Sequence, residues 1–540
     1  MSPSYIEEVS APVVNDAQQH IHIIGDTTPL PMGASPDTLG AKAWNLAKMA
    51  TLGLPVPPAF VLGTGWCRQP EAVHTQWPEA LQRLEALTGL SLGDSRHPLL
   101  LSVRSGAAVS MPGMMESLLN IGLTETTLPG MVRLTGHPRL AWDAYRRLIS
   151  AYGEVVAGIA ASCFEADLDD VRQANEEREL DFSALRDVAF RHLATYAREA
   201  GEPFPQDARM QLREAISAVF ASWHSAKARA YRNLHGISHD IGTAVTVQRM
   251  VFGNAGGLSG SGVGFTRDPS NGDPFPWVDF LFNAQGEDVV SGRRSAQGHD
   301  ELATVTPHLW NSLRQACAQL EEAFGDMQDF EFTIQSGRLH LLQTRNGKRT
   351  PQAAARIALD LWEQGVIEPA TALERTRHLD AQALTLRRVA STDGQALSPL
   401  AHAASATSGV ACGEIVMDEV QARARKSAGA PTILVRRDAE THDIAALEIA
   451  EGLLTQRGAR TSHAAVVARQ LGKVCLVGCE TMTLNEQLRT VTIGERQLRE
   501  GDILTLDGNE GIIYFGETWI EEQVPHALLE RLARLRDTHP

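Results

Sequence analysis

One short segment of the chain places a histidine where phosphoryl chemistry is possible. A strand-like stretch, residues 451–455, is followed by Gly458, Thr461 and Ser462, and then by His463 and several helix-favouring alanines. Thr461 or Ser462 can cap a helix that begins near His463. The free N–H groups and positive dipole end of a helix N-terminus suit a neutral imidazole that carries a phosphoryl group. On this geometry alone, a histidine that simply caps or packs is the alternative.

Two carboxylates further up the chain form a second candidate site. Asp329 and Glu331 stand two apart in a stretch of alternating polar and apolar residues, 326–334, so on a strand they point to the same face. Paired carboxylates on one face can hold Mg²⁺. A returning strand ends in Gln343 and Arg345, which a hairpin would bring near the carboxylates. The charged outer face of an ordinary antiparallel strand is the alternative.

Residues suited to holding phosphate occur earlier in the chain. Arg104 ends a buried strand and can make bidentate contacts to phosphate oxygens. Lys42 lies near a glycine at a helix start; because no Gly-x-x-x-x-Gly-Lys-Ser/Thr motif is present, a solvated surface lysine is the alternative. Gly260 and Gly262 belong to a glycine-dense stretch, 253–267, which suits close approach of the backbone to phosphate.

These residues need an α/β and α+β scaffold of several domains. Gln248 lies in a strand-like stretch where it can contact an adenine edge, and 3- and 4-residue apolar spacing predicts helices in 137–235. The boundaries that we expect are a flexible lead-in at 1–20, a nucleotide-binding domain at 21–350 with a helical insertion at 137–235, a linker or hinge at 351–404, a compact α/β domain at 405–517, and a terminal helix at 518–540.

Composition argues against several classes of protein. A length of 540 residues predicts two to four domains, and an apolar fraction of 43% suffices for several cores. The formal charge of −16 argues against nucleic acid or anionic membrane as a general partner. Without an apolar run of membrane-spanning length or a secretory signal, we expect a cytoplasmic protein. The six cysteines form no disulfide framework, and Cys475 and Cys479 are expected in the core.

The segment around His463 resembles the phosphohistidine segment of the phosphoenolpyruvate-utilising enzymes, whose pattern is Gly-Gly-x-Thr-Ser-His-Ala-Ala. Ala459 stands in place of the second glycine, and Arg460 in place of the usual apolar residue. Other segments resemble one member family of that class in the same order; they are 102–106, 110–115, 260–267, 283–290, 329–345 and 461–469. From about residue 20 to about residue 520, the chain therefore resembles the pyruvate, phosphate dikinase family.

This resemblance implies an ATP-grasp nucleotide-binding domain and a swivelling α/β phosphohistidine domain. It also implies that ATP, inorganic phosphate and Mg²⁺ take part, and that His463 accepts the β-phosphoryl group while AMP and pyrophosphate leave. Together with the residues inferred above, the expected site comprises Lys42, Arg104, Gln248, Gly260, Gly262 and Gln343 for the nucleotide, Asp329 and Glu331 for Mg²⁺, His463 and Arg345 for catalysis, and Thr461 for regulation by phosphorylation.

The family's third domain, a (β/α)₈ barrel that binds pyruvate and phosphoenolpyruvate, needs ~250 residues and has no counterpart in this sequence. We therefore expect this chain to perform the ATP half-reaction, with the acceptor held by a separate protein that carries the barrel. Two alternatives stay open: a nucleotide-binding regulatory protein without turnover, and a small-molecule phosphotransferase of the dikinase type. The short connection at 350–400 leaves little room for the extra substrate domain of the second alternative.

Overall fold

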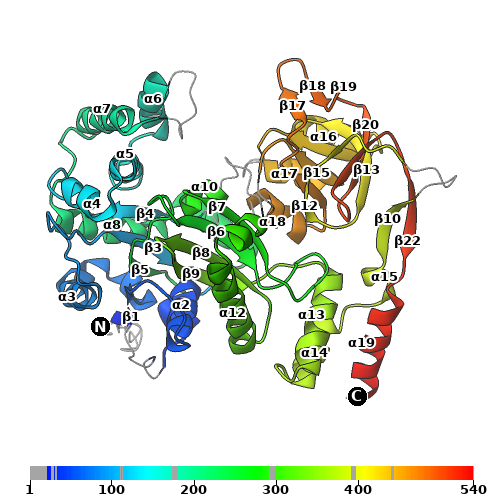
Figure 1. Ribbon diagram of the computed structural model, residues 1–540, viewed down its shortest axis with the longest axis horizontal. Coiled ribbons are helices and arrows are strands. Elements are labelled where there is room, and N and C mark those ends of the chain that lie inside the picture. Colours follow the sequence, from blue (N-terminus) through cyan, green and yellow to red (C-terminus); the bar gives the residue numbers. More distant parts are fainter. Residues whose placement is uncertain are drawn as a thin grey trace, which may run out of the picture. The chain divides into compact units, whose positions relative to one another are not determined.

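Figure 1 shows the protein as a computed structural model. The chain divides into two compact units, Met1–Val251 and Phe252–Pro540, and both mix helices with sheets. The expected mixed α/β, multidomain fold is thereby confirmed. The described residues are 21–25, 30, 33–109, 111, 114–172, 180–290, 298–390, 397–438, 443–458, 460 and 463–538. In these ranges no helix has both the length and the apolar character that a membrane crossing requires.

A five-stranded antiparallel sheet forms the centre of the unit Met1–Val251. Its strand order is β1-β2-β5-β3-β4, with the bounds β1 Ile21–Ile24, β2 Ala59–Leu62, β3 Leu101–Gly106, β4 Ser117–Ile121 and β5 Ala244–Arg249. Large aliphatic and β-branched side chains make these residues strand formers. All of β2 is buried, and in β3 only Arg104 is partly exposed. The strands expected around Arg104 and Gln248 are confirmed.

Short helices pack on this sheet and connect its strands. Helix α2 contacts β1 and β3, and helix α3 contacts β1 and β2. The helices and 3₁₀ segments here are α1 Pro36–Leu39, α2 Ala41–Thr51, η2 Thr64–Arg68, η3 Pro70–Thr75, α3 Trp77–Thr88 and α4 Leu128–Thr135. Gly40 lies between α1 and α2 at φ +74°, and a Cβ there would lie 1.9 Å from the Gly106 carbonyl oxygen. The end of β3 and the start of α2 are therefore in direct contact.

Most of the range 137–235 is helical, as its apolar spacing predicts. It contains α5 Pro138–Val155, α6 Ala161–Arg172, α7 Phe182–Ala200, α8 Ala208–Ser222 and α9 Ala226–His235. Tyr152 and Tyr196 pack edge-on to Phe204, at 5.4 Å between ring centroids in both pairs. The side chains of Asp207 and Ser225 accept hydrogen bonds from first-turn amides, which explains where α8 and α9 begin.

The unit Phe252–Pro540 contains a four-stranded antiparallel sheet that carries the predicted carboxylates. Its order is β7-β6-β8-β9, with the bounds β6 Gly260–Phe265, β7 Trp277–Phe282, β8 Gln328–Gln335 and β9 Arg338–Asn346. Three helices accompany it in sequence: α10 Gly286–Val290, α11 Asp300–Val305 and α12 Pro307–Phe324. Met327 and Phe265 pack against one face of a further helix, α13 Pro351–Glu363, through Ala353, Ile357 and Leu361.

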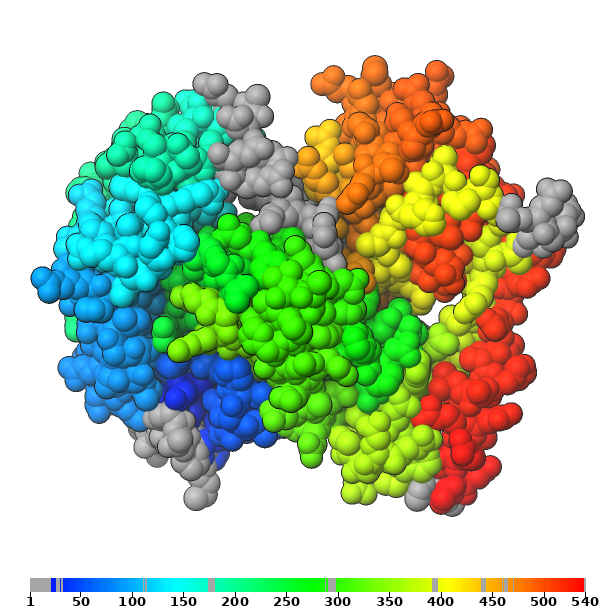
Figure 2. Space-filling view, in the orientation of Figure 1, coloured from blue at the N-terminus to red at the C-terminus, as the bar shows by residue number. Residues whose placement is uncertain are grey.

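The region expected as a linker, 351–404, is largely folded. It contains α13, α14 Pro369–Thr376, α15 Ala381–Leu384 and β10 Leu386–Ala390. Leucines of these helices form a core with α19 His526–Thr538, and Figure 2 shows α19 (red) beside the yellow-green residues of α13 and α14. The predicted terminal helix at 518–540 is wrong at its start, because β22 Trp519–Gln523 is a strand that pairs with β10.

An eight-stranded sheet forms most of residues 401–515. Its order is β11-β21-β20-β13-β14-β15-β16-β12, in which β13 to β16 run parallel. The strands are β11 Ala401–His402, β12 Ala404–Thr407, β13 Val410–Val416, β14 Thr432–Arg436, β15 Gly452–Thr455, β16 Val474–Val477, β20 Ile503–Asp507 and β21 Ile512–Phe515. The strand predicted at 451–455 is confirmed as β15.

The two faces of this sheet bury different elements. One face packs on α16 Glu419–Ser427, α17 Ile444–Ile449 and α18 His463–Gln470 through small side chains such as Ala465 and Ala468. The other face packs on a three-stranded antiparallel sheet made of β17 Met482–Asn485, β18 Thr490–Ile493 and β19 Arg496–Arg499. Cys475 and Cys479 are buried with free thiols, as expected.

Candidate active site

The β8–β9 hairpin brings four of the predicted site residues together. Its register pairs Asp329 with Arg345 and Glu331 with Gln343. Directly paired residues of an antiparallel ladder have side chains on the same face, so all four residues share one face of the sheet. Arg345 Nε lies 2.7 Å from Asp329 Oδ2, and Gln343 Nε2 donates to Glu331 Oε1 at 3.1 Å. The predicted proximity is confirmed.

Burial and charge act on Asp329 in opposite directions. Its side chain is only 15% exposed, and burial raises its pKa, while the adjacent Arg345 guanidinium offsets part of that rise. The nearby Glu331 carboxylate also raises the Asp329 pKa. A cationic ligand placed here would therefore relieve an electrostatic cost that Arg345 only partly removes.

The hairpin residues fit a Mg²⁺ site that is completed by a substrate. Mg²⁺ commonly uses one or two carboxylates together with substrate phosphates and water. Asp329 and Glu331 supply two carboxylates on one face. Among the residues described here, no group of three or more His, Cys, Asp or Glu side chains is arranged to hold a metal ion. The donor set thus suits a metal brought in with a phosphorylated ligand better than a structural metal cage.

The predicted helix at His463 is present. α18 begins at His463 and runs to Gln470. It follows β15, whose carboxyl end leads into Gly458 at φ +128°, a backbone conformation that favours glycine. Ligands bind preferentially outside the carboxyl ends of parallel strands. Thr461 lies outside the described residues.

Two arginines near His463 were not predicted as part of the site. Arg460 contacts Asp279 and lies over the Trp277 ring, with its guanidinium carbon 4.3 Å from the ring centroid. Arg469 is 4% exposed and donates to the Ala406 carbonyl at 2.7 Å, while its Nε and Nη1 have no hydrogen-bond partner among the described residues. The replacement of the family's apolar residue by Arg460 was the available signal; nothing in the sequence indicated Asp279.

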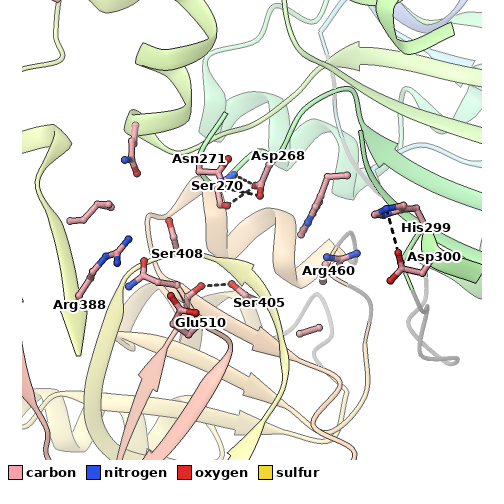
Figure 3. A pocket seen from close by; sticks show the side chains of 17 residues that line it. Asp268, Ser270, Asn271, His299, Asp300, Arg388, Ser405, Ser408, Arg460 and Glu510 are labelled. Carbon is pink, nitrogen blue, oxygen red and sulfur yellow. Dashed lines mark hydrogen bonds and ion pairs between the residues drawn. The ribbon is translucent and has the colours of Figure 1, made fainter. Parts of the chain in front are cut away.

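A polar cavity of about 560 Å³ adjoins Arg460 (Figure 3). Its wall includes Asp268, whose carboxylate accepts hydrogen bonds from Ser270 and Asn271, and also Arg388 on β10. These lining residues come from three places in the sequence: β10, the β6–β7 connection and the segment before α18. The cavity therefore lies where these three segments meet.

In the unit Met1–Val251, Lys42 and the end of β3 lie side by side. Lys42 is the second residue of α2, and a Cβ built on Gly106 would lie 3.7 Å from Lys42 Cβ. The Ala41 amide donates to the Ala107 carbonyl at 3.0 Å, which holds the start of α2 against this strand end. Arg104 lies in β3, two residues before Gly106, and is half-buried.

Three predicted nucleotide-binding residues have structural roles here. Gln248 is 2% exposed, and its Nε2 donates to the Pro57 carbonyl at 2.9 Å. A Cβ on Gly260 would lie 2.2 Å from Phe280 Cζ, and one on Gly262 would lie 2.4 Å from Phe332 Cζ. Packing therefore explains both glycines, and contact of these three residues with a nucleotide remains a prediction.

Comparison with known families agrees with this arrangement. Residues 69–310 and 301–365 match the family described as pyruvate phosphate dikinase, AMP/ATP-binding domain. Residues 429–511 match the PEP-utilising enzyme, mobile domain. The fold and the site thus place the chain in the class of PEP-utilising enzymes. Within that class, the chain belongs to the pyruvate phosphate dikinase family.

Three relatives illustrate the extent of the match. The pyruvate, phosphate dikinase of Clostridium symbiosum is 41% identical over 510 residues, which cover 92% of this chain and 58% of the relative. Pyruvate, phosphate dikinase 1, chloroplastic, of Zea mays is 41% identical, with 89% and 52% covered. The Rhizobium meliloti (strain 1021) enzyme is 41% identical, with 89% and 56% covered. The chain thus spans about half the length of these curated relatives.

Proposed function

We propose that this chain is a phosphotransferase that catalyses ATP- and phosphate-dependent phosphorylation of His463, as in pyruvate, phosphate dikinases. The observation that carries the proposal is the Asp329, Glu331, Gln343 and Arg345 face, in one chain with a histidine at the start of α18. We further propose that residues 21–350 have the ATP-grasp fold and that the domain containing His463 swivels between two sites. These proposals rest on family membership and on the four-residue face.

The proposed reaction converts ATP and inorganic phosphate to AMP and pyrophosphate. The His463 imidazole attacks the β-phosphorus, and the bond from that phosphorus to the oxygen kept by AMP breaks. The γ-phosphoryl group is transferred to inorganic phosphate, and the β-phosphoryl group stays on His463. Such transfers depend mainly on positioning and on neutralising charge. Arg345, fixed beside Asp329, is suited to neutralising phosphoryl oxygens.

Residues of this chain would orient the substrates. Asp329 and Glu331 would hold Mg²⁺, which when bound neutralises charge on the nucleotide phosphates. Lys42 and Arg104 are proposed to bind nucleotide phosphates. Arg104 lies in β3, and Lys42, on α2, lies beside the end of that strand. His463 is proposed to attack as the neutral imidazole, because only that form has a ring nitrogen lone pair free to bond to phosphorus.

The acceptor of the second half-reaction is proposed to be pyruvate or another small molecule bound outside residues 1–540. The relatives are named for pyruvate and phosphate, and this chain covers 58% of the first of them. A (β/α)₈ barrel, which the resemblance to the family implies, is the proposed acceptor site. The proposal predicts that added barrel protein accepts label from phosphorylated His463.

The decisive experiment follows the label from ATP. With Mg²⁺ and inorganic phosphate, β-³²P ATP should transfer label to the wild-type protein as an acid-labile, base-stable adduct. His463→Asn should abolish labelling, because the amide cannot accept a phosphoryl group. Labelling from γ-³²P ATP that persists in the presence of excess phosphate would contradict the proposal and indicate an ordinary kinase.

A further inference from the structure

The segment before His463 carries a buried ionic contact. Arg460 Nε and Nη2 donate to Asp279 Oδ1 at 3.1 and 3.0 Å, and Nη2 also donates to the Val278 carbonyl at 3.3 Å. The Trp277 ring packs against the same guanidinium at 4.3 Å. Three consecutive residues of β7 therefore contact one side chain from the phosphohistidine segment.

Because this contact is buried, losing one of its partners costs more free energy than losing one partner of a surface ion pair. Asp279 is only 1% exposed and Arg460 is 23% exposed. An ionised carboxylate buried to this degree is costly unless a cation or several hydrogen-bond donors accompany it. An apolar residue at position 460, usual in the family pattern, would supply neither charge nor N–H donors. The arginine in this chain therefore supplies an ionic contact that an apolar residue cannot make.

The register of the sheet places this contact on the active-site face. Asp279 pairs with Val263, and Val263 pairs with Glu331, which pairs with Gln343. Residues directly opposite one another point to one face, so Asp279 and Glu331 share the face of the sheet. They are separated by two strand spacings, roughly 10 Å. Arg460 is thus anchored on the carboxylate face, three residues before His463.

The second unexpected arginine supports the same arrangement. The guanidinium of Arg469 on α18 lies 5.1 Å from the Phe265 ring centroid and 5.6 Å from that of Trp277. The carboxylates of Asp329 and Asp279 both act electrostatically on Arg469. Both ends of the segment 460–469 are therefore directed to β6, β7 and β8.

We propose that Arg460 is a positioning residue that clamps the phosphohistidine segment onto β7, over the face that carries Glu331 and Asp329. The inference rests on the proposed function, because the clamp matters only if His463 reacts at that face. The described contacts of Arg460 are with β7 and α18, so it acts by holding its own position in the chain, three residues before His463, against β7. The contact must open for His463 to reach an acceptor elsewhere, so its ionic character makes docking sensitive to salt.

The test compares four variants with a matched control. The variants are Arg460→Met, which restores an apolar residue, Arg460→Lys, Asp279→Asn, and the Arg460→Met/Asp279→Asn double variant. The control, Arg423→Met, removes an arginine of α16 whose side chain is 64% exposed and pairs with Glu419, outside the residues that line the cavity. Single-turnover transfer of label from β-³²P ATP gives the maximal rate and the half-saturating ATP concentration for each protein.

The clamp predicts a loss of rate without a loss of ATP binding. Arg460→Met should lower the maximal rate about tenfold, while half-saturating ATP changes less than about twofold, because misplacement of a reacting group lowers the rate and not substrate affinity. Asp279→Asn should act similarly, the double variant should be no slower than the slower single variant, and Arg460→Lys should recover part of the rate. Arg423→Met should behave as wild type.

Hydrogen exchange separates failure of the clamp from failure of the proposed function. In Arg460→Met, amides in 452–458 and 463–470 should exchange faster than in wild type, whereas those in β8 and β9 should not change. If wild type is labelled and Arg460→Met reacts at the wild-type rate, the clamp is wrong and the proposed function stands. If wild type is not labelled, the proposed function fails, and unchanged exchange in Arg460→Met would overturn the clamp as well.

Discussion

Two arginine–carboxylate pairs in the unit Phe252–Pro540 differ in how the chain holds them. Arg345 and Asp329 are opposite residues of one hairpin, 16 positions apart in sequence. Arg460 and Asp279 are 181 positions apart and come from different sheets or their connections. Hairpin hydrogen bonds keep the first pair adjacent even when the salt bridge opens. The second pair is held by its own interactions and by those of its neighbours Trp277 and Arg469.

This difference fits the different roles that we propose for the two pairs. A pair fixed by register keeps a charged surface in constant geometry, which phosphoryl transfer requires. A pair between elements distant in sequence can form and break as a unit, which a domain that alternates between two sites requires. In the proposed function, the face on β8 and β9 would be the permanent site, and the Arg460 contact on β7 would form and break as His463 moves.

The largest expected effect separates the two pairs by activity. Arg345→Gln should lower the rate of His463 labelling roughly 10²- to 10³-fold, because it removes the charge that we propose to neutralise phosphoryl oxygens. Arg460→Met should lower it only about tenfold, because the reacting groups remain present. Single-turnover labelling at saturating ATP measures both rates. Equal losses in the two variants would contradict the division into a catalytic and a positioning arginine.

A third pair, confined to one helix, gives a reference for stability. Asp143 and Arg146 lie one turn apart on α5, 2.6 Å between Oδ1 and Nη2. Although burial opposes ionisation, Arg146, Arg147 and Arg139 outweigh it and lower the pKa of Asp143 to about 2. Asp143→Asn should lower the free energy of unfolding by ~3 kcal/mol at neutral pH, because it leaves buried Arg146 without its carboxylate.

The pH dependence of that loss follows from the lowered pKa. A carboxyl group with a depressed folded-state pKa contributes stability above its unfolded pKa of about 3.9, and this contribution is lost as pH falls toward the folded value. The difference between wild type and Asp143→Asn should thus be constant near pH 6 and shrink below about pH 4. Urea unfolding at several pH values measures it. A difference that is unchanged down to about pH 3 would show that packing, not charge, causes the loss.

The next effect tests whether the sheet beneath the carboxylates tolerates any added atom. In Gly260→Ala, the new Cβ would lie 2.2 Å from Phe280 Cζ and 2.7 Å from the Leu281 carbonyl oxygen. We expect a loss of about 2 kcal/mol in the free energy of unfolding, since overpacking a core costs 1–3 kcal/mol. Gly286→Ala is the matched control, because nothing lies within 4 Å of a Cβ there. If nucleotide affinity falls while stability does not, the glycine serves the nucleotide and not the packing.

The smallest expected effect concerns salt. Raising NaCl from 0.1 to 1 M shortens the screening length from about 10 to about 3 Å. Amide exchange in 463–470 should rise by a factor of about two to three in wild type. It should rise less in Arg460→Met, which lacks the Arg460 contact but keeps the interactions of Arg469 with Asp279 and Asp329. Exchange in β8 and β9 should be unchanged in both proteins, because main-chain hydrogen bonds hold that hairpin. If salt accelerates amide exchange in 463–470 equally in wild type and in Arg460→Met, the proposal that Arg460 forms an ionic clamp is wrong.

The prediction of the site was most accurate where short-range sequence patterns decide the structure. Alternation in 326–334 and a two-residue turn at Ser336 and Gly337 predict a hairpin, and its register follows from the alternation, so Arg345 and Gln343 were correctly placed beside the carboxylates. Prediction failed where a distant partner decides the structure. Residues 519–523 form a strand because β10 offers an edge, and the expected linker folds because α19 covers its leucines.

The sequence by itself determined the strand and helix positions around the candidate site, the family pattern at His463, and the shared face of Asp329 and Glu331. These properties depend on side-chain period, on turn residues and on capping, which act over a few residues. Only the tertiary structure decided that Asp279, Trp277 and Arg460 meet. A buried carboxylate needs a cation or hydrogen-bond donors nearby, and only the folded chain decides which side chains lie close enough. A contact between residues 181 positions apart leaves no periodic pattern in the sequence.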